Sequence, residues 1–251
     1  MRISIITVVF NGRKTIEKCL DSVREQECPF PVEHVIVDGG SDDGTLECIK
    51  RKNCVSTIIS EPDEGIYDAM NKGIRAAGGD VVGILNADDF YASSHVLRHV
   101  VQLLDEKGLD SCYGDLVYVD ADEVTKVKRY WRSGDYQPRK FYWGWMPPHP
   151  TFFVRREVYL KYGLFNLSFG TAADYELMLR FLLKHRISCG YIPEILVKMR
   201  SGGTSNASLK TRLIANWNDR LAWKVNDLKP YPWTLYLKPL SKVTQYIFNK
   251  R

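Results

Sequence analysis

Hydrophobic positions over roughly the first hundred residues alternate between two periods. Short apolar runs rich in β-branched residues are each followed by a stretch with apolar residues at helical spacing. The predicted strands are residues 3–10, 32–37, 55–60 and 81–85, and the predicted helices are residues 16–23, 43–50, 66–77 and 93–104. This alternation, with short connections, predicts an α/β fold with parallel strands and flanking helices. Ligands bind such folds beyond the carboxyl ends of the strands.

The pattern changes after about residue 110. We expect an antiparallel hairpin formed by 113–119 and 124–131, an irregular wall rich in aromatics and proline at 136–150, strands at 151–154, 187–192 and 195–200, a helix at 173–185, and helices from 208 onward, broken near Pro230 and Pro232. The predicted organisation is one domain over residues 1–205, with a first half at 1–110 and a second at 111–205. A basic, aromatic helical extension at 206–251 follows.

Composition indicates a globular protein, with 45% hydrophobic and 26% charged residues. No stretch approaches 18 uninterrupted apolar residues, so a membrane-spanning helix is not expected. The apolar run at 3–10 is short and lacks a small-residue cleavage site, which favours a buried strand over a signal peptide. The six cysteines are scattered without metal-ligand spacing, which predicts reduced thiols and a cytoplasmic location.

The chain has a formal net charge of +5, and this charge is unevenly distributed along the sequence. Residues 201–251 hold nine Lys or Arg and only two acidic residues, Asp219 and Asp227, together with many aromatics. A basic, aromatic segment suggests an anionic partner such as a membrane surface or a nucleic acid. A solvated helical face explains the same composition, and the sequence alone does not choose between the two.

Polar residues follow each of the four predicted strands, namely Asn11-Gly12, residues 38–45, residues 61–65 and residues 86–89. We expect these strand ends to meet in one crevice. Asp88 and Asp89 are adjacent carboxylates that repel each other unless a cation lies between them, and Mg²⁺ or Mn²⁺ prefers such oxygen ligands. Capping of the helix near Ser93 would account for one of the two. Neither GxGxxG nor GxxxxGK[ST] is present, so a diphosphate would be bound through metal and side-chain charge.

Four segments, at residues 4–12, 37–45, 71–74 and 85–89, together resemble the family 2 glycosyltransferases of the GT-A fold. The resemblance extends over about residues 3–200. It implies a Rossmann-like, mostly parallel sheet with a small antiparallel section, and an inverting enzyme that uses nucleotide-diphosphate sugars. It also implies a nucleotide-sugar-binding half at 1–110 and an acceptor-binding half at 111–205. Segments 149–153 and 173–177 resemble bacterial members that build capsule, exopolysaccharide and lipopolysaccharide.

The resemblance also implies roles for individual residues. Asp174 would be the catalytic base, although Ala173 replaces the usual Glu before it. Asp88 would be the principal ligand of a Mn²⁺ or Mg²⁺ ion, with Asp89 beside it, and Asn86 replaces the usual first Asp. The end of the first strand, from Thr7 to Phe10, and Asp38 would hold the nucleoside, with the Asp38 carboxylate accepting a hydrogen bond from the base. The implied donor-binding residues are Thr7, Val8, Val9, Asn11, Asp38, Asp43, Asp63, Asn71, Asn86, Ala87, Asp88 and Arg200.

His149 and Trp145 are weaker candidates for acceptor contacts. The predicted function is transfer of a sugar, from a UDP-sugar in the favoured version, to a carbohydrate or lipid-linked acceptor in bacterial cell-surface polysaccharide synthesis. We expect the protein in the cytoplasm or on the inner face of the membrane, without a nucleic-acid partner; self-association stays open. A sugar-nucleotide pyrophosphorylase, or a non-catalytic carbohydrate-binding or scaffold protein that keeps the fold, remain as alternatives.

Overall fold

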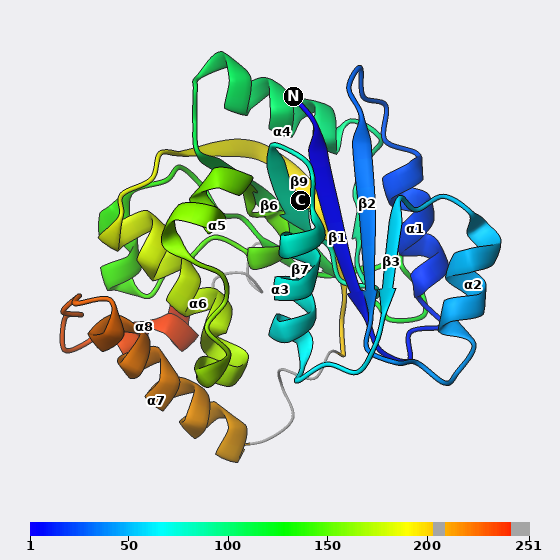
Figure 1. The fold of residues 1–251 in the computed structure, drawn as a ribbon. Coiled ribbons are helices and arrows are strands. Elements are labelled where there is room, and N and C mark those ends of the chain that lie inside the picture. The colour runs from blue at the N-terminus through cyan, green and yellow to red at the C-terminus, as the bar shows by residue number, and fades with distance from the viewer. Residues whose placement is uncertain (203–208, 242–251) are drawn as a thin grey trace.

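The structure is a computed structural model that describes residues 1–202 and 209–241, and side chains outside 209–215 and 239–241. Its described part contains a nine-stranded sheet in the order β3-β2-β1-β4-β8-β6-β9-β5, with β7 paired to β6 (Figure 1). The strands are β1 (Ile3–Val9), β2 (Val32–Asp38), β3 (Thr57–Ser60), β4 (Val81–Ile84), β5 (Phe90–Tyr91), β6 (Ser111–Val119), β7 (Val127–Trp131), β8 (Phe153–Arg155) and β9 (Cys189–Arg200).

Most of this sheet is parallel. β1 pairs in parallel with β2 and β4, β2 with β3, and β6 with β9. The antiparallel section consists of β8 between β4 and β6, β5 beside β9, and β7 beside β6. The predicted fold, a mostly parallel sheet with flanking helices and a small antiparallel section, is confirmed.

Helices cover both faces of the sheet (Figure 1). They are α1 (Ile16–Arg24), α2 (Thr45–Lys52), α3 (Ile66–Ala76), α4 (Val96–Glu106), α5 (Arg156–Tyr162), α6 (Ala173–Met178), α7 (Leu209–Val225) and α8 (Thr234–Ser241), with short 3-10 turns η1 (Pro138–Trp143), η2 (His149–Thr151) and η3 (Leu167–Ala172), and a π-helical turn η4 (Leu179–Lys184). Successive residues of β1 point to opposite faces of the sheet, and each face is covered by its own layer of helices. Ile6 and Val8 pack with α3, whereas Val9 on the opposite face packs with α1 and α2.

Three local predictions were wrong. The strand predicted at 151–154 is split into turn η2 and strand β8, and helix α5, which follows at once, was not predicted. The two strands predicted at 187–192 and 195–200 form the single strand β9, which continues through Pro193. Its pairing with β6 shifts register beside Gly114 and Asp115, and this irregularity accommodates the residue that lacks an N–H donor.

The extension predicted at 206–251 is described from residue 209 to 241, where it is helical and interrupted at 226–233, around the two prolines Pro230 and Pro232. It packs on the second half of the domain through Trp223, whose indole N–H donates to the Tyr175 hydroxyl over 2.9 Å. Thr234 donates to the Tyr142 carbonyl over 2.7 Å. Among the described residues, no helix has the length and apolar character needed to cross a bilayer.

Candidate active site

The carboxyl ends of the parallel strands lie along one edge of the sheet. Val9 of β1 is opposite Asp38 of β2, and Asp38 is opposite Ser60 of β3. β4 runs parallel to β1, so the turn at 85–89 emerges at the same edge. The polar segments that follow the first four parallel strands therefore come together, as their positions in the sequence predict.

Three predicted donor residues organise the loops of this edge. Asp38 is fully buried, and its carboxylate accepts from the Ser60 hydroxyl over 2.7 Å and from the backbone and hydroxyl of Ser41. Asp43 accepts from the Arg13 backbone N–H over 3.0 Å. A hydrogen bond from the Thr45 hydroxyl is the main cause that lowers the pKa of Asp43. The Asn11 side chain accepts from the Asp42 N–H over 3.0 Å, which ties the two loops together.

Gly39 leaves space for an aromatic ring and a carboxylate at the end of β2. A Cβ atom at this position would stand 2.5 Å from Asp63 Oδ2 and 3.4 Å from the Phe10 ring. Phe10 is 67% exposed, which is unusual for a side chain that directly follows a buried strand. The absence of a side chain at Gly39 lets Phe10 and Asp63 approach the end of β2 from either side.

The turn after β4 holds Asn86, Asp88 and Asp89. The Asn86 amide donates to Asp89 Oδ2 over 3.3 Å. Asp89 Oδ1 and Asn86 Oδ1 are both buried without a hydrogen-bond partner. Burial raises the pKa of Asp88, and burial together with the charge of Asp88 raises the pKa of Asp89 well above its usual range. Two carboxylates and a free amide oxygen fit a hard divalent cation, which would satisfy the orphaned oxygens and stabilise the charged carboxylates.

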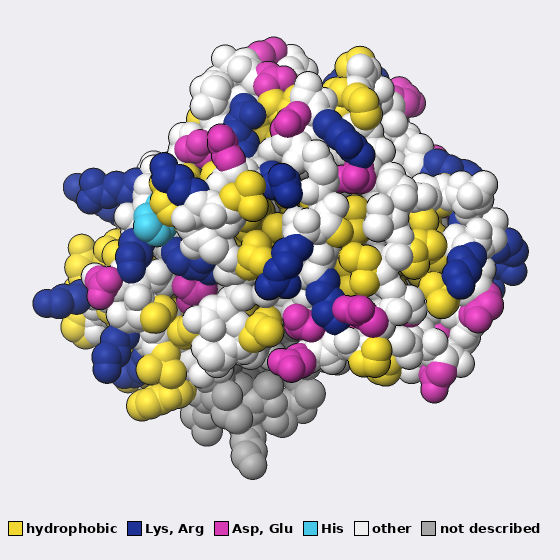
Figure 2. Space-filling view, viewed as in Figure 1, with side chains coloured by type: hydrophobic (Ala, Val, Ile, Leu, Met, Phe, Trp, Pro, Cys, Tyr) yellow, Lys and Arg dark blue, Asp and Glu magenta, His cyan; other side chains and the backbone are white. Residues whose placement is uncertain are grey.

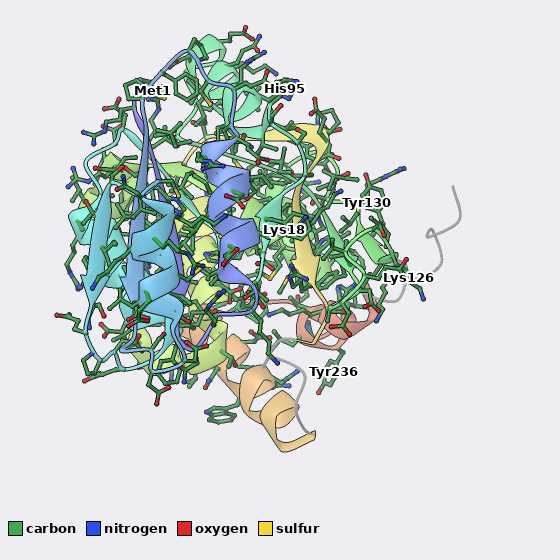
Figure 3. The ribbon with its side chains drawn as sticks, turned by 90° about the vertical axis from the view of Figure 1, so that its right-hand side faces the viewer. Met1, Lys18, His95, Lys126, Tyr130 and Tyr236 are labelled. Carbon is green, nitrogen blue, oxygen red and sulfur yellow. The ribbon has the colours of Figure 1, made fainter. Side chains whose placement is uncertain are left out.

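The described residues contain no group of three His, Cys, Asp or Glu side chains arranged to hold a metal. Any ion bound by Asp88, Asp89 and Asn86 would therefore complete its shell with ligand oxygens or water. Arg200 at the end of β9 adds positive charge beside both carboxylates, because β5 pairs with β9 directly after Asp89. Its guanidinium donates to the Ala121 carbonyl over 2.6 Å. Lys18, labelled in Figure 3, lies 4.7 Å from the centre of the Phe90 ring, so a second cation stands near this turn.

Asp174 lies on a different element, in the first turn of α6, and is half-buried. Tyr67 on α3 lies close to Asp174, and the Asp174 carboxylate acts on its phenol. Burial, reinforced by the Asp174 charge, raises the pKa of Tyr67 well above its usual value, so the phenol stays protonated and can donate. His149 lies within the influence of the same carboxylate, and burial lowers its pKa, which favours the neutral ring.

Phe165 connects Tyr67 and His149. Its ring centre is 5.2 Å from that of Tyr67 and 5.5 Å from that of His149. Asn71, one helical turn after Tyr67, holds the Phe165 backbone with both ends of its amide, each over 2.9 Å. The surroundings of Asp174 are thus built from α3, η2 and the loop before η3.

Two predicted donor residues have other roles in the structure. Thr7 is fully buried, and its hydroxyl lies 2.9 Å from His34 Nε2 within the sheet, so its side chain is not exposed to a ligand. Asn71 is 3% exposed and is engaged by Phe165, so its amide serves as a clamp between segments. Trp145 packs edge-on to Phe141 and donates to the Ser133 carbonyl over 3.0 Å, which makes it part of the wall.

Val8, Val9 and Ala87 are buried core residues at the sheet edge, so any contact that they make with a ligand would be through their backbone.

Sequence reasoning missed Tyr67. The available signal was its position four residues before Asn71, which places both on one face of α3. Whether the predicted residues bind a donor stays a prediction.

Comparison with known proteins defines the family. The model of "Glycosyl transferase family 2" matches residues 4–163. This chain belongs to glycosyl transferase family 2. It is 34% identical over 185 residues to an uncharacterized glycosyltransferase of Mycobacterium tuberculosis, covering 72% of this chain and 69% of the relative. It is 29% identical over 208 residues to a PGL/p-HBAD biosynthesis glycosyltransferase of Mycobacterium bovis, covering 81% and 78%.

Solved structures share the fold of this family 2 glycosyltransferase. Staphylococcus aureus TarS 1–349 in complex with UDP superimposes with a TM-score of 0.66 at 19% identity, over 91% of this chain and 67% of TarS 1–349. The mannosyltransferase PcManGT from Pyrobaculum calidifontis, in complex with GDP-Man and Mn²⁺, gives 0.63 at 18% identity, over 99% and 76%. Family membership makes the chain a glycosyltransferase and argues against the pyrophosphorylase alternative.

Proposed function

We propose that this glycosyltransferase inverts the anomeric configuration of a sugar that it moves from a nucleotide-diphosphate donor to a saccharide acceptor. The observation that carries the proposal is the separation of two acidic groups. Asp89 is buried and Asp88 is half-buried after β4, whereas Asp174 is on α6 close to Tyr67. The Asp88 and Asp89 pair would act on the leaving diphosphate, and Asp174 would act on the attacking hydroxyl. A single inverting displacement needs groups at these two separate places.

In the proposed reaction, Asp174 accepts the proton of the acceptor hydroxyl as its oxygen attacks the anomeric carbon. The bond from that carbon to the diphosphate oxygen breaks, and its electron pair leaves with the nucleotide. Help of this kind from a general base contributes roughly 10²–10⁴-fold to the rate. A divalent ion held by Asp88, Asp89 and the Asn86 oxygen would neutralise the negative charge that develops on the leaving diphosphate.

We place the nucleoside at the spot flanked by Phe10 and Asp63. An exposed aromatic ring can stack on a base, and a carboxylate accepts a hydrogen bond from a base N–H group. Arg200, at the same edge of the sheet, would contact the diphosphate. The TarS structures contain UDP and UDP-GlcNAc, and the PcManGT structure contains GDP-Man. We propose a UDP-sugar as the donor, of hexosyl or N-acetylhexosaminyl type.

The acceptor we propose is a lipid-linked saccharide used in bacterial cell-surface polysaccharide synthesis, met at the inner face of the cell membrane. The name of the M. bovis relative places that protein in PGL/p-HBAD biosynthesis. In this chain, His149 lies beside Asp174, where an acceptor hydroxyl would enter. Trp145, within the wall of the second half, would act through packing.

The test is transfer from a panel of UDP-, GDP- and dTDP-sugars with Mn²⁺ or Mg²⁺ to a synthetic polyprenyl-diphosphate saccharide. Release of nucleoside diphosphate gives the rate, and NMR of the product gives the anomeric configuration. We expect an inverted product and loss of transfer in Asp174→Asn, whereas Glu157→Gln, an exposed carboxylate on α5, keeps full activity. A retained configuration, or normal rates in Asp174→Asn, would contradict the proposal. Donor binding without any turnover would instead support a non-catalytic binding module.

A further inference from the structure

Helix α7 exposes an apolar stripe on its outer face. Trp217, Leu221 and Val225 follow one another at four-residue spacing and are 63%, 37% and 50% exposed. The opposite face of α7 is buried, with Ala222 and Trp223 in the main core. The helix is therefore fixed to the domain on one side and presents apolar surface on the other.

A cluster of exposed aromatic side chains continues this surface. Trp233 has its ring centre 5.2 Å from that of Tyr231 and 5.9 Å from that of Trp143 on η1. Tyr236 on α8 is 63% exposed and meets Arg220 of α7, which donates to its hydroxyl over 3.4 Å. Tyr236 projects beside α7 in Figure 3, and Arg220 therefore joins the α7 stripe to the aromatic cluster.

Basic residues lie among these aromatics. Arg220, Lys224 and Lys229 are exposed and line one cavity of about 520 Å³ at the end of α7. Asp227 also lines this cavity, but its carboxylate is paired with Lys184 over 3.0 Å. Figure 2 shows hydrophobic and basic side chains interspersed where α7 lies in Figure 1. We call Trp217, Leu221, Val225, Tyr231, Trp233 and Tyr236, with the three basic residues, the aromatic-basic face.

We propose that the aromatic-basic face docks this protein onto a membrane surface that contains anionic lipids. Tryptophan and tyrosine favour the boundary between headgroups and acyl chains, because their rings are apolar and their N–H or O–H groups remain hydrated. Lys and Arg close to the surface are attracted to anionic headgroups. A purely solvated face would not gather two tryptophans with two tyrosines, so charge and apolar character together select a lipid surface.

The position of this face connects docking with catalysis. Trp223 of α7 donates to Tyr175 of α6, next to Asp174, and the Asn218 amide donates to the Phe169 carbonyl over 3.0 Å. The helix that faces the membrane is thus attached to the helix that carries the proposed base. This inference rests on the proposed function in one respect: a lipid-linked acceptor would reach Asp174 from the surface on which the protein is docked.

Binding to vesicles tests the inference with the full chain. Sedimentation with vesicles of equal parts phosphatidylcholine and phosphatidylglycerol should recover the protein, and vesicles of phosphatidylcholine alone should recover much less. The variant R220Q/K224Q/K229Q should partition roughly 100-fold less, because each basic residue near the surface contributes about fivefold. The matched control K50Q/K107Q/K126Q removes the same charge from exposed positions on other elements and should bind like the parent chain.

A second variant tests the contribution of the aromatic side chains of the aromatic-basic face. Trp233→Ser with Tyr236→Ser should lower partitioning to the mixed vesicles at high salt, whereas Leu160→Ser, at a residue of α5 that is 68% exposed, should not. Circular dichroism and melting temperature verify that each variant is folded. Absence of vesicle binding by the parent chain, equal binding to both vesicle types, or equal losses in the face and control variants would each overturn the inference.

Slow hydrolysis of the donor without vesicles is measured in the same samples. Because the aromatic-basic face lies outside the donor site, all these variants should hydrolyse the donor at the parent rate. Donor turnover without vesicle binding would overturn the docking surface alone. Vesicle binding without any donor turnover would leave the surface supported and contradict the proposed function.

Discussion

Tyr67 on α3 lies close to Asp174 in the first turn of α6, and the charge of this carboxylate helps to raise the pKa of the phenol. The two residues are more than a hundred positions apart in the sequence, and each is on a helix of a different half of the domain. α3 packs on the parallel strands of the first half, and α6 belongs to the second half. This proximity brings the proposed base next to a helix that packs on the strands where the donor would bind.

The first prediction concerns this pair. Tyr67→Phe keeps the ring packing on Phe165 but removes the phenol O–H beside the Asp174 carboxylate. We expect that this O–H donates to Asp174 during turnover, so kcat should fall about tenfold, the loss of one charge-assisted hydrogen bond, with little change in KM for the donor. Steady-state kinetics measure both. Tyr159→Phe, at a buried tyrosine that packs on Phe181, is the control and should retain kcat. A rise in KM alone would assign Tyr67 to donor binding.

The second prediction concerns the acidic turn after β4. Asp88→Asn should lower transfer at least 100-fold, and a chelator should do the same to the parent enzyme, with recovery on adding Mn²⁺. Asn86→Asp should bind Mn²⁺ more tightly, because a third carboxylate replaces a neutral oxygen. Calorimetry of Mn²⁺ binding measures this directly. Asp105→Asn on α4 is the control carboxylate, and full activity in the presence of a chelator would refute a metal requirement.

The third prediction uses the space at Gly39. In Gly39→Ala the new Cβ would stand 2.5 Å from Asp63 Oδ2, so the carboxylate must move away. If Asp63 contacts the base, KM for the donor rises severalfold while kcat stays near the parent value. Gly78→Ala, where a Cβ would meet its nearest atoms at 3.4 Å, is the comparison. An unchanged KM in Gly39→Ala would remove Asp63 from the donor site.

The fourth prediction is a dependence of stability on pH. Burial lowers the pKa of His34 to about 3, compared with about 6.5 in an unfolded chain. Between these values the unfolded state binds the extra proton, so stability is complete above pH 6.5 and is lost as pH falls toward 3. At pH 4 the loss from this group is on the order of 3 kcal/mol. Urea unfolding of His34→Gln should show a weaker decline over the same range; an identical decline would assign the effect to other groups.

The central layout of the fold was predictable because two signals agree along residues 1–104. One is the hydrophobic period within each element, and the other is the polar and glycine residues that separate the elements. Continuous β-branched runs such as 3–10 are unambiguous strands when helical spacing follows them. β5 and α5 were not predictable, since a two-residue strand exists only through its partner β9 and a short helix only through its packing. The single strand β9 was hidden by Pro193, because a sequence does not show that β9 bulges there against β6 and so tolerates the proline.

The candidate site divides in the same way. Residues directly after strands, such as Asp38 and Asp88, could be located from the sequence because the parallel topology fixes where strand ends meet. Tyr67 and Phe165 could not, since their contact with the Asp174 region depends on how α3 packs against a loop far along the chain. Thr7 shows that position alone does not determine where a side chain points. It is a polar residue near a strand end, but its hydroxyl points into the sheet toward His34.

The continuity of the sheet has a mechanical consequence. β8 bonds to β4 on one side and to β6 on the other, so backbone hydrogen bonds run without interruption from the first half of the domain into the second. The two halves therefore cannot swing apart as hinged rigid bodies without breaking this ladder. Any closure around the two substrates has to come from the segments along the sheet edge, and new acceptor preferences can arise there while the framework stays rigid.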